Sequence, residues 1–154
     1  MKKILPYIIA AIGVGGYLYY RNVKNLVKTF TARIAKVSFN MKETQRALFL
    51  KAIFDVNVEL KNPSAYIGTI EGVKLDVLIS GKLLGSVNKT DKITIQANNS
   101  TIIPIQIGLN TLSLYGNISN AIKALSSGTP LSLNIVGTVL TNSGAIDLNE
   151  TVKL

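Results

Sequence analysis

Apolar and polar residues alternate along most of the chain after residue 36. The clearest alternating segments cover 54–60, 75–79, 93–97, 103–109, 131–139 and 146–148, and a shorter segment covers 35–39. A period of two places apolar side chains on one face of a strand and polar side chains on the other. The pattern therefore predicts about seven strands, each with one buried face.

Turn-forming residues separate these segments. Clusters of Asn, Pro, Ser and Gly occur at 62–64, 80–81, 85–86, 98–100, 127–130 and 142–144. Such residues adopt positive φ angles or preset the bend of a turn. Short strands separated by such turn residues predict a mainly β domain, an antiparallel two-sheet β-sandwich. Pro104 lies inside a predicted strand but has no backbone N–H to donate to a neighbouring strand. We therefore expect it at a sheet edge or a bulge.

One segment of this region has helical rather than alternating spacing. Between residues 112 and 125, apolar residues recur at intervals of three and four, and Gly128 follows shortly afterwards. This is typical of an amphipathic helix that ends at a glycine. We expect one short crossover helix between two strands.

The first 20 residues are typical of a membrane anchor. Residues 4–20 carry no charge and would span about 25 Å as a helix, short of a bilayer core but sufficient if flanking basic side chains reach the headgroups. A cleaved signal peptide is the rival, but the apolar run continues to Tyr20, past the small residues Gly13 and Gly15. We expect an N-terminal transmembrane helix in a single-pass protein, and the side of the membrane that the folded part faces stays open. The membrane-anchoring residues are Ile4, Leu5, Ile8, Ile9, Ile12, Val14 and Leu18.

Basic and aromatic residues surround this segment. Residues 21–34 show apolar positions at helical spacing with basic positions on another face, which fits either a basic juxtamembrane helix or a plain connector. We therefore divide the chain into an anchor (1–20), a juxtamembrane segment (21–34) and a β-sandwich domain (35–154). The expected lipid-headgroup contacts are Lys2, Lys3, Tyr17, Tyr19, Tyr20, Arg21, Lys24 and Lys28.

Charge and composition exclude several functions. The net charge is +9, but seven basic and no acidic side chains lie in residues 1–36, so the remaining chain is nearly neutral and does not suggest nucleic-acid binding. The sequence has no His, Cys or Trp, and we expect no catalytic residues, no metal site and no cofactor. Asp55, Asn57 and Glu59 share one strand face and could form a carboxylate pair or a Ca²⁺ site, but a solvated outer face is the simpler interpretation.

The segment FDVNVELKNPS, the later ISGKLLG and the following ITIQANNSTIIPIQI resemble the late embryogenesis abundant type 2 family, also called the water stress and hypersensitive response domain. The matching motif residues are Asn62, Pro63, Gly81 and Gly85. The resemblance covers approximately residues 33 to 154. It implies an immunoglobulin-like or fibronectin-like sandwich without known catalysis, often anchored by one helix and associated with stress protection.

Three hypotheses about function follow. The leading hypothesis is a non-enzymatic, membrane-anchored structural or interaction protein, in one version a minor virion protein that links a membrane to a capsid. The alternatives are a stress-protective membrane-anchored protein and a carrier that binds lipid or another apolar ligand between its sheets. We expect a lipid bilayer as partner, together with protein partners or a homo-oligomer, because long edge strands with few charges tend to pair.

Overall fold

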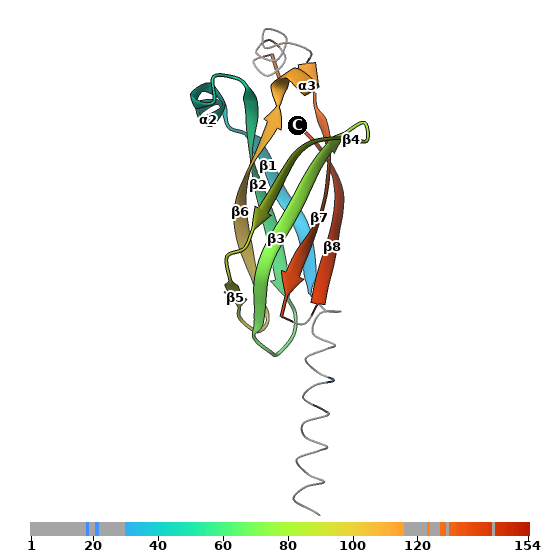
Figure 1. Ribbon diagram of the computed structural model, residues 1–154. Coiled ribbons are helices and arrows are strands. Elements are labelled where there is room, and N and C mark those ends of the chain that lie inside the picture. Colours follow the sequence, from blue (N-terminus) through green and yellow to red (C-terminus); the bar gives the residue numbers. More distant parts are fainter. Residues whose placement is uncertain are drawn as a thin grey trace, which may run out of the picture.

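Two antiparallel β-sheets pack face to face in this protein (Figure 1). The structure is a computed structural model that describes residues 18, 21, 30–115, 123, 127–128, 130–142 and 144–154. Its elements are β1 (Thr31–Phe39), α2 (Met41–Arg46), β2 (Lys51–Asn62), β3 (Gly68–Ile79), β4 (Lys82–Lys89), β5 (Ile93–Ile95), β6 (Asn99–Asn110), α3 (Thr111–Tyr115), β7 (Ser132–Thr141) and β8 (Gly144–Lys153). The predicted fold class, a mainly β protein with two antiparallel sheets, is confirmed.

The smaller sheet has the strand order β1-β2-β6. Pro104 lies on β6 opposite Asn57 of β2, and β6 is an edge of this sheet. The Pro104 carbonyl points away from β2 and accepts a hydrogen bond from Lys89 Nζ at 3.3 Å. The missing N–H of Pro104 therefore costs no hydrogen bond between β2 and β6, as expected for a proline in an edge strand.

The larger sheet has the order β4-β3-β7-β8, and β5 pairs with the first residues of β3. The sheets also meet along their edges, where β1 contacts β8 and β4 contacts β6. At the first of these edges, the Ile34 N–H donates to Glu150 Oε1 at 3.0 Å. Edge groups that would otherwise be exposed are in this way partly covered within the chain.

The core lies between the two sheets and consists of the apolar faces that alternation predicts. On β2, Phe54, Val56, Val58 and Leu60 are at most 2% exposed. The other strands add their own alternate positions, among them Leu75, Val77, Ile103, Ile105, Ile107, Leu109, Leu133, Ile135, Val139 and Leu148. Removal of these side chains from water drives the association of the sheets.

The structure has eight strands among its described residues, and the additional one, β4, corrects the prediction of about seven. Gly85 was expected in a turn but lies inside β4, opposite Val77. The register then shifts, so that Leu78 pairs with Leu83 and Leu84 is the extra residue of a bulge. Because the bulge breaks the period of two, the sequence pattern of this strand was not visible.

The sandwich also begins earlier than the predicted boundary at residue 35. Strand β1 starts at Thr31, and Ala32 and Ile34 pack against the core, so residues 31–34 are not part of a juxtamembrane helix. Positions four apart lie on one face of both a helix and a strand, and the spacing from Phe30 to Ile34 therefore fits both periods.

The helices differ from expectation as well. Helix α2 was not predicted; Asn40 caps it by accepting from the Glu43 N–H at 3.0 Å. The predicted helix 112–125 begins as α3 at Thr111, and most of it lies outside the described residues.

The predicted anchor and most of the basic and aromatic residues around it also lie outside the described residues. Of the residues expected to contact the membrane, Leu18 and Arg21 are described, and both are helical and exposed. Within the described part of the chain, no helix is long and apolar enough to cross a bilayer. The anchor stays a prediction.

Candidate functional site

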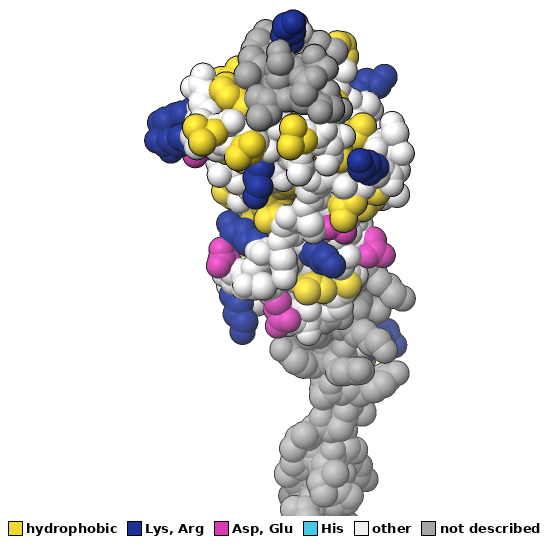
Figure 2. Space-filling view, turned by 45° about the horizontal axis from the view of Figure 1, so that its top comes forward, with side chains coloured by type: hydrophobic (Ala, Val, Ile, Leu, Met, Phe, Trp, Pro, Cys, Tyr) yellow, Lys and Arg dark blue, Asp and Glu magenta, His cyan; other side chains and the backbone are white. Residues whose placement is uncertain are grey.

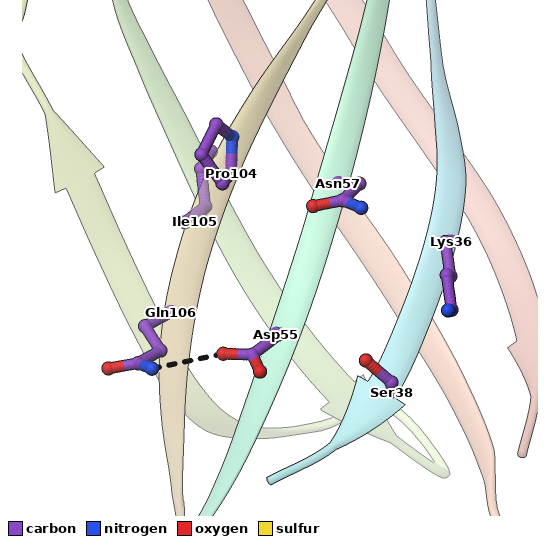
Figure 3. Close-up of a pocket in the computed structure, with 7 residues that line it drawn as sticks. All are labelled: Lys36, Ser38, Asp55, Asn57, Pro104, Ile105 and Gln106. Carbon is purple, nitrogen blue, oxygen red and sulfur yellow. Dashed lines mark hydrogen bonds between the residues drawn. The ribbon is translucent and has the colours of Figure 1, made fainter.

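The outer face of the sheet β1-β2-β6 carries the polar residues that the sequence singled out. A shallow depression of about 480 Å³ lies on this face (Figure 3). Its lining residues are Lys36, Ser38, Asp55, Asn57, Pro104, Ile105 and Gln106. The depression is open to solvent, and the acidic group in it is Asp55.

Both carboxylate oxygens of Asp55 accept hydrogen bonds from neighbouring amides. Gln106 Nε2 on β6 donates to Asp55 Oδ1 at 3.0 Å (Figure 3). Asn40 Nδ2 donates to Asp55 Oδ2 at 2.9 Å, and the Asn40 side-chain oxygen caps α2. Asp55 therefore connects β2 to β6 and to the start of α2, which is a structural role.

Glu59 has a separate partner. Arg33 Nε on β1 donates to Glu59 Oε2, and the two side chains form an ion pair on the exposed face. Asp55 and Glu59 lie four residues apart on one strand, so about 13 Å separates their positions, too far for a paired-carboxylate site. No group of three His, Cys, Asp or Glu residues able to hold a metal ion occurs among the described residues.

We expect the substitution Asp55→Asn to lower stability by about 1 kcal/mol, because one introduced N–H must face a donor of Asn40 or Gln106. Chemical denaturation of the full chain, followed by circular dichroism, measures this change. Asn57→Ala in the same depression is the control and is expected to change stability by less than about 0.5 kcal/mol. A Ca²⁺-dependent rise in the melting temperature of the unmodified chain would contradict the structural interpretation of this face.

Asn62, the first family-motif residue, is fully buried at the end of β2. Its side-chain amide donates to the carbonyl oxygens of Tyr66 at 2.7 Å and Gln96 at 3.1 Å. Its side-chain oxygen accepts from the Ser64 N–H at 3.0 Å and from the Ser64 hydroxyl at 2.7 Å. Asn62 thus holds the β2–β3 loop against the end of β5, while the adjacent Pro63 is exposed.

The two glycines of the motif have different structural roles. Gly81 forms the β3–β4 turn with Ser80, and both have positive φ, 79° and 51°. Gly85 has no room for a side chain, because a Cβ there would lie 2.6 Å from Leu109 Cδ2 and 2.8 Å from the Gly108 carbonyl oxygen. The motif therefore supports the sandwich; its residues do not form a reactive site.

Sequence reasoning missed a turn between α2 and β2. Leu48 and Phe49 both have positive φ, 52° and 57°, which is uncommon for residues with large side chains. The buried Thr111 hydroxyl donates to the carbonyls of Phe49 and Leu50 at 2.6 and 3.0 Å. Residues 47–50 are all apolar and include none of the residue types typical of turns, so the sequence carries no signal for this turn.

No family model matches the sequence, and no curated protein matches it. Several solved structures do. A protein from Archaeoglobus fulgidus matches with a TM-score of 0.50 at 10% identity, covering 80% of this chain and 92% of that chain. A structure described as ApaA from Bordetella pertussis matches with a TM-score of 0.50 at 8% identity, covering 81% and 91%. Identities this low show a shared fold alone.

A structure described as a late embryogenesis abundant protein also matches, with a TM-score of 0.45 at 12% identity, covering 99% of this chain and 86% of that chain. The fold and the structural use of its polar residues define the protein as a two-sheet antiparallel β-sandwich domain.

Proposed function

We propose that this protein is a non-enzymatic, membrane-anchored structural or interaction protein with a sandwich of the late embryogenesis abundant type 2 kind. The observation that carries the non-enzymatic part is the pairing of Asp55 and Glu59, the carboxylates of the candidate face, with amide and guanidinium groups of the domain itself. The membrane part rests on the uncharged segment 4–20 and its basic flanks.

The junction between this segment and the sandwich supports a tethering role. Phe30 is 7% exposed and belongs to the core cluster. Its ring fills the space beside Gly68, where a Cβ would lie 2.2 Å from Phe30 Cζ. The chain is therefore held firmly at Phe30, where it enters the domain.

Two versions of this function remain proposals. A minor virion protein that links bilayer to capsid would need a small, unreactive domain on a membrane stalk, and so would a stress-protective envelope protein. The neighbouring genes separate the two versions: capsid and packaging genes favour the first, and stress or envelope genes favour the second. The lipid-carrier hypothesis draws no support from three depressions that lie on the outer faces of the sheets.

Carbonate extraction of membranes tests the anchor. We expect the full-length chain in the membrane pellet, and the double substitution Ile8→Arg with Ile12→Arg is expected to release it, because each arginine at the centre of a helix opposes insertion by roughly 2.5 to 3.5 kcal/mol. Ile67→Arg is the matched control, since Ile67 is exposed on the sandwich. Uncleaved protein in the soluble fraction would refute the anchor, and a shortened soluble protein would indicate a cleaved signal peptide.

A further inference from the structure

The end of the sandwich opposite the entry of the chain has a surface of its own. The chain enters at Thr31, at the lower end of β1, whereas α2, the β3–β4 turn, α3 and the end of β8 lie at the upper end (Figure 1). We call this upper end the distal tip and define it by residues 41–51, 80–83, 110–113 and 153–154.

Four leucines of the distal tip have at least half of their surface exposed to solvent. The exposed fraction is 74% for Leu48 and 52% for Leu50, in the turn after α2. It is 56% for Leu83 in the β3–β4 hairpin and 50% for Leu112 in α3. The leucines therefore project from three separate elements rather than from the walls of one groove.

Basic side chains are concentrated at the same end. Of the ten basic side chains in residues 37–154, the distal tip holds the following five, all exposed: Lys42, Arg46, Lys51, Lys82 and Lys153. It holds one of the eight acidic side chains, Glu43, which pairs with Arg46. Figure 2 shows basic and hydrophobic side chains interspersed over this end. The nearly neutral domain thus has a positively charged tip and a more acidic body.

Hydrogen bonds hold the turn that carries Leu48 and Leu50, although Leu48 and Phe49 have positive φ. Besides its bonds from Thr111, the turn is closed by the Phe49 N–H, which donates to the Thr44 carbonyl at 3.0 Å. The buried Thr44 hydroxyl accepts from the Ile53 N–H at 2.9 Å. A leucine in the left-handed region, with most of its surface in water, contributes little to folding. The apolar side chain of such a leucine is better suited to a contact with another molecule than to a place in water.

We propose that the distal tip docks on a bilayer surface that contains anionic phospholipid. The leucines enter the boundary between headgroups and acyl chains, and the lysines contact phosphate groups. A fluid bilayer can accept apolar side chains from three separate projections, whereas a protein partner would need a matched surface of about 800 Å². This inference does not depend on the anchor; with the anchor, the protein would connect two surfaces.

Tryptophan fluorescence tests the proposal on the full chain, because the natural sequence contains no Trp. The variant Leu48→Trp, carried in phosphatidylcholine nanodiscs, is mixed with vesicles of phosphatidylcholine and phosphatidylglycerol. We expect a blue shift and quenching by brominated lipid, and neither with vesicles of phosphatidylcholine alone. Asn149→Trp, at an exposed position in the middle of β8, is the control and is expected to show no shift. Failure of the anchor is seen separately, as failure of the chain to enter the nanodiscs.

Two further variants separate the contributions of charge and apolar contact. Lys42→Gln and Lys82→Gln are each expected to weaken vesicle binding about fivefold at low salt. Leu48→Asn is expected to weaken it without lowering the denaturation midpoint, because asparagine tolerates positive φ. Equal binding to neutral vesicles, no shift with any vesicle, or binding to an acidic polypeptide in place of vesicles would overturn the proposal.

Discussion

Substitution of Gly137 by alanine is expected to destabilise the protein by about 3 kcal/mol, a large effect for a single methyl group. Gly137 lies in β7 opposite Leu75 of β3, in the middle of the five-stranded sheet. A Cβ at this position would lie 2.2 Å from the Lys74 carbonyl oxygen and 2.7 Å from Leu75 Cδ2. Because the nearer atom belongs to the backbone of a paired strand, relief of the clash would displace the β3–β7 ladder.

Gly108→Ala is the matched control for this change. Gly108 also lies within a strand, but a Cβ there would meet side-chain carbons, Lys51 Cδ at 3.1 Å and Ile53 Cδ1 at 3.3 Å. Flexible side chains can move, and alanine lowers the entropy of the unfolded chain, so we expect a change of less than about 1 kcal/mol. Denaturation of both full-chain variants measures the difference. Equal stability of the two variants would contradict the prediction. It would mean that β3 and β7 move apart around the added methyl group without loss of stability.

Asn62→Ala is expected to lower stability by about 3 kcal/mol, because buried polar groups lose their partners. The carbonyls of Tyr66 and Gln96 lose a donor, and the Ser64 N–H loses an acceptor. All of these contacts lie in the loop between β2 and β3 and at the end of β5. Local opening of this end is therefore expected before global unfolding, visible as faster amide exchange at residues 64–66.

Two comparisons identify the source of this loss. Asn62→Asp retains an acceptor for Ser64 but removes the donor to Tyr66 and Gln96, so a similar loss of stability would assign the effect to the donated bonds. Asn88→Ala, at an exposed position on β4, is expected to change stability by less than about 0.5 kcal/mol. A harmless Asn62→Ala would mean that water replaces the side chain.

Much of the sandwich could be predicted because alternation and burial have the same physical origin. The positions from Phe54 to Leu60 alternate in polarity, and each apolar one is buried. The two-residue turn at Ser80 and Gly81 was also predicted correctly, since glycine tolerates the required positive φ. Local pattern is sufficient wherever one strand face points to the core and the other to solvent.

Prediction failed where the local pattern was ambiguous or interrupted. Residues 31–34 fit a helix and a strand equally well, and their pairing with β2 makes them a strand. In β4, the bulge at Leu84 places the adjacent residues Leu84 and Gly85 both toward the core, which interrupts the alternation. Only the strand partners decide such cases, because hydrogen-bond register is a property of two segments and not of one.

The candidate face shows the same division. The sequence predicted that Asp55, Asn57 and Glu59 share a strand face, and the structure confirms it. Their roles depended on residues far along the chain, since Gln106 reaches Asp55 from β6 and Arg33 reaches Glu59 from β1.

By itself, the sequence determined a mainly β domain with two antiparallel sheets, the identity of most core residues and the absence of His and Cys chemistry. These follow from side-chain period and from composition, both of which can be observed in a single chain segment. Only the tertiary structure decided that the motif residues Asn62 and Gly85 are structural, and that leucines and lysines from distant segments meet at one end. The physical reason is that contact and local charge density depend on how strands pair, which joins residues that the sequence keeps far apart.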